Sequence, residues 1–271
     1  MAENDVALMA HLMRRAGFGA TFEELETYAA QGYEATVDEL LSPMKQPDLE
    51  MDLLERYFID WKEMNALEVN QAYLTYRMIN TKRPLQEKMT LFWHGILTSS
   101  FRKSKGRVLA QNQLFREMGM GRYDTMLKAV SRDPAMMIYL DSRSNKKEAP
   151  NENYSRELME LFTMGVGNYT EEDVRESARA FTGWQLKRKT AFYFNNRHHD
   201  FGNKVFLGQS GDFDGDDIVD IIMMQPASAE YICRRLWRFF AYENPEPGAV
   251  SYTHLRAHET DSYLVCRLLL E

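Results

Sequence analysis

Four side chains of the sequence could together perform acid–base or metal chemistry. Glu157 and Glu160 are three residues apart, so on a helix their carboxylates lie on one face. Glu87 and His94 are two helical turns apart, which again places them on one face. Carboxylates and imidazoles bind divalent metal ions and act as general acids and bases. These residues predict a metal-dependent hydrolase as one candidate function.

The same four residues also have a purely structural interpretation. A glutamate near the start of a helix is stabilised by the helix dipole. A histidine beside a tryptophan, as His94 is beside Trp93, is commonly a hydrogen-bonded core residue. The two later glutamates can form ion pairs with cations elsewhere in the chain, namely Arg156, Lys88 and Arg179.

A polar turn with two histidines is a second candidate site. His198, His199 and Asp200 are consecutive, and a carboxylate can orient an imidazole for base catalysis or metal binding. The pair that could do this chemistry is His199 with Asp200. The alternative interpretation is an exposed polar turn without a function of its own.

The acidic loop that begins at Asp212 partly resembles a calcium-binding loop. Asp212, Asp214 and Asp216 alternate as calcium ligands do, but Gly215 is at the fourth position, where the helix–loop–helix site needs glycine at the sixth. The twelfth position is Met223 instead of a bidentate glutamate. Capping of the following helix by Asp214 or Asp216 explains the loop more simply.

Positive charge is concentrated in two segments of an acidic chain. Residues 101–122 contain six cations and one carboxylate, and residues 187–204 contain five cations and one carboxylate. The net charge of −7 argues against general nucleic-acid binding, because phosphate binding favours a basic surface. The two segments are either solvated faces or converge on an anionic ligand.

Helical spacing of apolar residues covers most of the chain and must position these groups. Thr21 with Glu24, and Thr170 with Asp173, are capping boxes that mark helix starts. Pro84 suits the first turn of a helix. We expect helices within residues 7–16, 22–31, 33–41, 53–61, 67–78, 85–98, 108–118, 123–131, 134–140, 151–162, 170–182, 216–225 and 227–242.

Only one region has the pattern of a sheet. Residues 191–194 and 205–207 are short aromatic and β-branched runs that flank a polar turn, so we expect them to pair as a hairpin. The predicted fold is therefore a mainly α, multi-helix domain with a single core and one small β-hairpin insert.

The sequence argues against several classes of protein and lacks the motifs of several enzyme families. Cys233 and Cys266 form neither a disulfide framework nor a cysteine zinc site. The chain has no apolar run of about 18 residues, so we expect no membrane span. The first residues are acidic and lead into Arg14 and Arg15, so no signal peptide is visible. No serine-hydrolase, zinc-protease, phosphate-loop or dinucleotide motif is present.

The last 22 residues, 250–271, resemble a translated sequencing adapter. Residues 250–260 and 264–271 match the two fixed parts of such an adapter in one reading frame, and a variable index separates them. The tail contains His254 and His258, which would otherwise be a helical metal-ligand pair. We therefore expect residues 1–249 to be a domain truncated at its C-terminus, from a metagenomic sequence, and residues 250–271 to lie outside the fold.

Several segments in order resemble a large bacterial family known as domain of unknown function 1800. The longest is Asn151-Glu-Asn-Tyr-Ser-Arg-Glu-Leu-Met-Glu-Leu-Phe162. The others are residues 11–19, 87–94, 111–116, 131–135, 165–171, 212–217 and 235–240, so the resemblance covers essentially residues 7–247. Family members often carry His-x-His after the Phe-Trp pair, whereas here His94-Gly95-Ile96 retains only the first histidine. A metal held by that histidine pair would lack one ligand here.

The resemblance implies no established activity. It does imply a longer full-length chain and, for many members, export. Since no catalytic motif is present, we expect a non-catalytic binding or assembly module, with the cell envelope as the location that the resemblance suggests. The metal-dependent hydrolase is the alternative.

Overall fold

The computed structural model describes residues 3–50, 56, 67–104 and 106–243. The first half contains α1 (Glu3–Ala16), α2 (Phe22–Gln31), α3 (Tyr33–Leu40), the 3-10 turn η1 (Pro43–Lys45), α5 (Leu67–Asn80), α6 (Pro84–Ile96), α7 (Phe101–Ser104), α8 (Arg107–Met118), α9 (Tyr123–Ser131) and α10 (Pro134–Tyr139). The second half contains η2 (Ser142–Ser144), α11 (Asn153–Glu157), the π-helix η3 (Leu158–Thr163), α12 (Glu171–Ala180), β1 (Trp184–Lys187), β2 (Ala191–Phe194), β3 (Lys204–Phe206), β4 (Gln209–Gly211), α13 (Gly215–Met223) and α14 (Pro226–Phe240).

The predicted mainly α fold is confirmed, and local chemistry explains where its helices begin. Thr21 and Thr170 each accept a backbone N–H from the third helical residue, whose carboxylate binds back to the threonine N–H. Both predicted capping boxes are therefore present. Pro84 is in the first turn of α6, where a missing N–H costs nothing. Apart from residue 56, the predicted helix at 53–61 lies outside the described residues.

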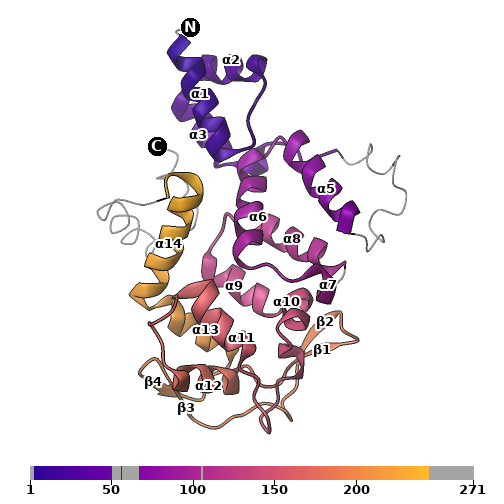
Figure 1. The fold of residues 1–271 in the computed structure, drawn as a ribbon, viewed down its shortest axis with the longest axis vertical. Helices are drawn as coiled ribbons and strands as arrows, with labels where there is room; N and C mark the ends of the chain where they lie inside the picture. Colours follow the sequence, from indigo (N-terminus) through magenta and orange to yellow (C-terminus); the bar gives the residue numbers. More distant parts are fainter. Residues whose placement is uncertain (1–2, 51–55, 57–66, 105, 244–271) are drawn as a thin grey trace.

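One large hydrophobic cluster joins most of the helices, whereas Tyr73 of α5 forms a small second cluster with Leu109 of α8. The large cluster runs from Met9 in α1 through Trp93 in α6 and Phe115 in α8 to Leu236 in α14. Helices α1 to α3 project from one end of the molecule, and the strands and polar loops lie at the other end (Figure 1). No helix of the described part of the chain is long and apolar enough to cross a membrane.

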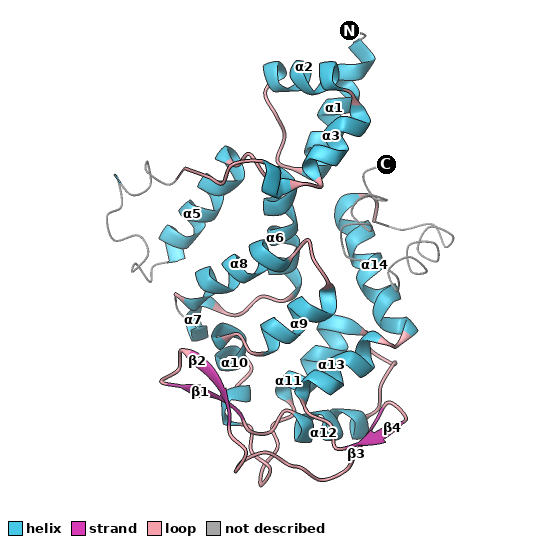
Figure 2. Cartoon of the chain, turned by 180° about the vertical axis from the view of Figure 1, so that it is seen from behind, coloured by secondary structure: helices cyan, strands magenta, loops and turns pink. Residues whose placement is uncertain are grey.

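The two predicted strands are present, but two further strands were not predicted and the predicted pairing is wrong. Ala191–Phe194 pairs with Trp184–Lys187, and Lys204–Phe206 pairs with Gln209–Gly211, so the described residues form two hairpins instead of one. The two hairpins lie on opposite sides of the molecule (Figure 2). Each strand pairs across a loop of two or three residues, because closing a short loop costs less entropy than closing the longer connection between residues 194 and 204.

The family-like segment after Asn151 is not a continuous α-helix. It changes at Leu158 into the π-helix η3, in which Thr163 Oγ1 bonds to the Leu158 carbonyl and Met164 N–H to the Met159 carbonyl. Tyr231 and Tyr123 donate hydrogen bonds to the carbonyls of Leu161 and Phe162. π-Helical turns are rare in proteins, but those that occur are often at functional sites. The spacing of apolar residues in the sequence does not distinguish a π-helical turn from an α-helix.

Candidate functional site

Glu87 is the centre of a buried ion-pair cluster. Arg77 Nε on α5 and Arg116 Nε on α8 each donate to Glu87 Oε1 at 2.7 Å, and Arg116 adds a second bond to Oε2 at 3.0 Å. The Glu87 side chain is only 2 % exposed, and both arginines are buried. This carboxylate already has two cationic partners, so it serves to join three helices.

His94 lies on the same helix as Glu87 but is half-buried in other surroundings. Burial lowers the pKa of His94, and the neighbouring Asn112 side chain on α8 opposes that shift. Its Nδ1 atom lies 3.5 Å from Thr98 Oγ1. Helix α6 packs against α1, α3, α5 and α8, whereas the segment of Glu157 and Glu160 packs against α12, α13 and α14.

Glu157 and Glu160 are close to one another at the junction of α11 and the π-helix. Burial raises the pKa of Glu157, and the Glu160 charge raises it further. Tyr169 donates a hydrogen bond to Glu160 Oε2 at 3.1 Å. Neither glutamate pairs with the cations considered in the sequence. Arg156 pairs with Glu152 and Glu171, Arg179 with Glu176 and Asp200, and Lys88 bonds to the Gly17 carbonyl.

The described residues contain no group of three or more histidine, cysteine, aspartate or glutamate side chains that could hold a metal ion. His94, Glu87, Glu157 and Glu160 therefore do not converge on one site, although Glu157 and Glu160 do interact. Metal binding and hydrolysis by these residues stay predictions.

The acidic loop is a helix start, as its capping interpretation predicts. Asp214 Oδ1 accepts the N–H groups of Asp216 and Asp217, and Asp217 binds back to the Asp214 N–H. Asp216 pairs with Arg132, and Asp212 Oδ1 lies 3.3 Å from the buried Lys204 ammonium. Each of the three candidate calcium ligands thus has a partner within the protein.

Removal of this cap should have a modest cost. We expect Asp214→Ala to lower the free energy of unfolding by about 1 kcal/mol, because two N–H groups at the start of α13 lose their acceptor. Chemical denaturation followed by circular dichroism measures the change. Asp214→Asn retains an acceptor oxygen and should lose less; equal losses for both variants would contradict the capping role.

His199 and Asp200 do not act on one another in the way that the sequence suggested. Asp200 pairs with Arg179 at 2.8 Å. His199 instead donates from Nδ1 to the Thr182 carbonyl at 2.7 Å, because a carbonyl can only accept. The neutral ring then carries its lone pair on Nε2, so a backbone carbonyl, not a carboxylate, orients this imidazole.

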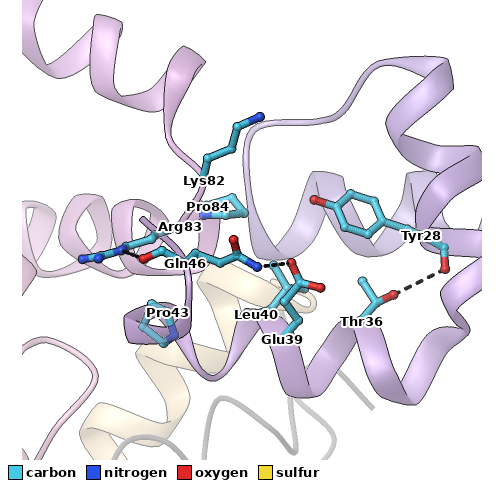
Figure 3. A pocket seen from close by; sticks show the side chains of 9 residues that line it. All are labelled: Tyr28, Thr36, Glu39, Leu40, Pro43, Gln46, Lys82, Arg83 and Pro84. Atoms are coloured by element: carbon cyan, nitrogen blue, oxygen red, sulfur yellow. Dashed lines mark hydrogen bonds between the residues drawn. The ribbon is translucent and has the colours of Figure 1, made fainter. Parts of the chain in front are cut away.

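A small pocket lies between α3 and the start of α6 (Figure 3). Gln46 donates to Glu39 Oε1 at 2.8 Å, and Arg83 donates to the Gln46 carbonyl at 2.9 Å. Several of its polar groups thus bind one another, and no sequence pattern predicted the pocket.

The two basic segments meet at the other end of the molecule. Arg107 Nε, at the start of α8, donates to the Lys189 carbonyl in the β1–β2 turn at 3.1 Å. Not every cation of the segments is available: Arg116 belongs to the Glu87 cluster, Arg122 pairs with Asp124 and Lys204 is buried. Lys103 also has a carboxylate partner, Asp141. The cations without one in the two short stretches that this contact joins are here called the basic surface, and they are Arg102, Arg107, Lys187, Arg188 and Lys189.

The turn of the basic surface has an unusual backbone. Arg188 and Lys189 have φ angles of 52° and 63°, and Thr190 N–H bonds to the Lys187 carbonyl across them. This is the pattern of a type I′ turn, which strongly favours Asn-Gly, since side chains with a Cβ pay for positive φ. Sequence patterns missed this turn because it lacks those residues, yet two cations occupy its tip.

A model of one protein family matches residues 11–263 and is described as "Protein of unknown function (DUF1800)". The chain belongs to this family. No curated protein and no solved structure matches it.

The resemblance stated for the DUF1800 motifs is thereby confirmed. The matched residues extend beyond Ala249 into the segment that resembles an adapter. Residues 244–271 lie outside the described residues, so the adapter origin of 250–271 stays a prediction. His94 is in the matched region.

Proposed function

We propose that this DUF1800 protein is a non-catalytic binding module that holds an anionic partner on the basic surface. The observation that carries the proposal is the hydrogen bond from Arg107 to Lys189, which brings two cation-rich segments together from positions 82 residues apart. An anionic polymer or lipid of the cell envelope would be a partner of this chemistry.

The charges of the basic surface support the proposal. Arg102, Lys187, Arg188 and Lys189 are exposed, and none of the five cations forms an ion pair with a carboxylate in the described part of the chain. Yet the protein has 40 carboxylates for 33 lysines and arginines. Like charges gathered without counter-charges repel one another, and an anionic ligand removes that repulsion.

The backbone strain at the turn supports the same interpretation. A non-glycine residue in the left-handed region costs roughly 1 kcal/mol or more. Arg188 and Lys189 both take that conformation at the hairpin tip. Arginine and lysine fit this turn less well than Asn-Gly would, and a residue that lowers stability in this way is typical of a binding position.

A variant that improves the turn while removing its charges tests the proposal. We expect Arg188→Asn with Lys189→Gly to weaken binding of fluorescent dextran sulfate at least tenfold at low salt, since two cations are lost. The same variant should raise the melting temperature by a few degrees, because Asn-Gly suits the turn. Fluorescence anisotropy and thermal denaturation measure the two effects.

The matched control is Arg14→Asn with Lys82→Asn. It causes the same change in net charge at exposed positions outside the basic surface, and we expect less than a twofold change in affinity. Equal weakening by both variants would show that binding follows net charge alone. A wild-type protein that fails to bind the polyanion would overturn the proposal.

A further inference from the structure

Two exposed aromatic side chains lie near the end of β2 away from the basic turn. Phe194 and Phe201 are 41 % and 56 % exposed, and both contact the His199 ring. Single exposed aromatic residues are ordinary, but neighbouring ones mark an interaction site. Phe194 and Phe201 are here called the aromatic platform.

The platform is rigidly built around His199. The His199 ring is 3 % exposed and lies edge to face with Phe194 at 5.0 Å and with Phe201 at 4.6 Å. Its Nδ1–H is held by the Thr182 carbonyl. The rings are thus fixed in place before any ligand arrives.

His199 retains a free acceptor at the platform. Nε2 has no hydrogen-bond partner within the described ranges. With Nδ1 protonated, Nε2 is an acceptor for a ligand hydroxyl.

Further cations border the platform. Lys147 N–H donates to the His198 carbonyl at 2.9 Å, which joins loop 145–151 to the loop that follows β2. Lys146, Lys147 and Arg197 are exposed on these loops, and none pairs with a carboxylate in the part of the protein that is described. Cations therefore lie on both sides of the aromatic rings: these three at one end of β2 and the basic turn at the other.

We infer that the anionic partner is an acidic polysaccharide, which crosses the aromatic platform and pairs with the cations on either side; this rests on the proposed function. The apolar faces of sugar rings pack on aromatic side chains, the carboxylates of uronic acids pair with arginine and lysine, and a sugar hydroxyl donates to His199 Nε2.

Two other polyanions fit the geometry less well. A nucleic acid is generally bound by a surface that is basic overall, whereas here a few cations lie on a chain with a net charge of −7. A lipid bilayer takes up side chains that project freely, whereas Phe194 and Phe201 pack against His199. Both remain outcomes of the test.

The test measures binding of the full 271-residue chain to labelled oligogalacturonate and to its uncharged methyl ester. We expect the acid form to bind at least tenfold more tightly than the ester, and more tightly than oligothymidylate or phosphatidylglycerol vesicles. Phe194→Ala with Phe201→Ala should weaken oligogalacturonate binding about tenfold, which is the effect of losing one or two stacking contacts. The same variant should leave dextran sulfate binding within twofold of wild type.

The control for lost aromatic surface is Phe22→Ala, because Phe22 is also exposed but lies on α2. It should change neither affinity. Binding of dextran sulfate without oligogalacturonate binding overturns this inference and leaves the proposed function standing. Preference for oligothymidylate or for vesicles also overturns it, and binding of no polyanion overturns both.

Discussion

Glu87→Gln should lower the free energy of unfolding by about 3–5 kcal/mol, the largest effect that we expect from one substitution. Glutamine has nearly the same shape as glutamate but no charge, so Arg77 and Arg116 would remain buried without the carboxylate that they share. Arg77 retains the Tyr73 hydroxyl at 3.3 Å and, as its one carboxylate partner among the described residues, Asp48 at 3.0 Å, whose side chain is exposed. The cluster joins α5, α6 and α8, so these helices should separate first.

Urea denaturation at neutral pH measures the loss. The control is Glu172→Gln, which breaks an exposed pair with Arg175 and should cost far less than Glu87→Gln. Should Glu87→Gln fail to fold, the triple variant Glu87→Met with Arg77→Leu and Arg116→Leu removes all three charges and is expected to recover much of the stability. A loss as small as that of the control would mean that the cluster is hydrated.

Asp133 should make stability fall as the pH rises from about 4 to about 6. Burial raises the pKa of Asp133 to about 6, although hydrogen bonds from the Met136 and Ala135 backbone and from Gln111 act against that shift. The folded state therefore holds a proton that the unfolded state has released, and folding becomes less favourable as that proton is lost. The full effect is about 3 kcal/mol, from a shift of about two pKa units.

Asp133→Asn isolates this effect. Asparagine is neutral at every pH, and its side-chain oxygen can still accept the Met136 N–H at the start of α10. Above pH 7 the free energy of unfolding of the variant should approach or exceed that of the wild type. Near pH 4, where wild-type Asp133 is protonated in the folded state, the variant should be the less stable of the two by the largest margin. Unfolding free energies of both proteins from pH 4 to pH 8 give the difference. A difference that stays constant with pH would show that Asp133 titrates normally when folded.

The helices could be predicted because their signals are local. Thr21, Thr170 and Asp214 satisfy N–H groups within three residues of themselves, so a short stretch of sequence contains both partners. The helical ranges 123–131 and 108–118 were predicted almost to the residue for the same reason. Strand pairing failed because the β1–β2 turn holds Arg188 and Lys189 in a conformation that the sequence gives no reason to expect.

The candidate site was predictable in composition but not in arrangement. The sequence showed two basic segments, and only folding could bring Arg107 to Lys189. It also showed Glu87 with His94, and His199 with Asp200, as possible partners. Burial then placed Glu87 between two arginines, and a carbonyl took the position expected of Asp200 at the His199 ring.

The sequence by itself thus determined the helical content, the helix starts, the family and the positions of the charges. Each of these depends on neighbouring residues or on order along the chain. The tertiary structure decided which charges are buried and paired, which remain free, and which carbonyl orients His199. These outcomes depend on contacts between distant segments, and the energy of a charge depends on its burial and its partners, which no local pattern contains.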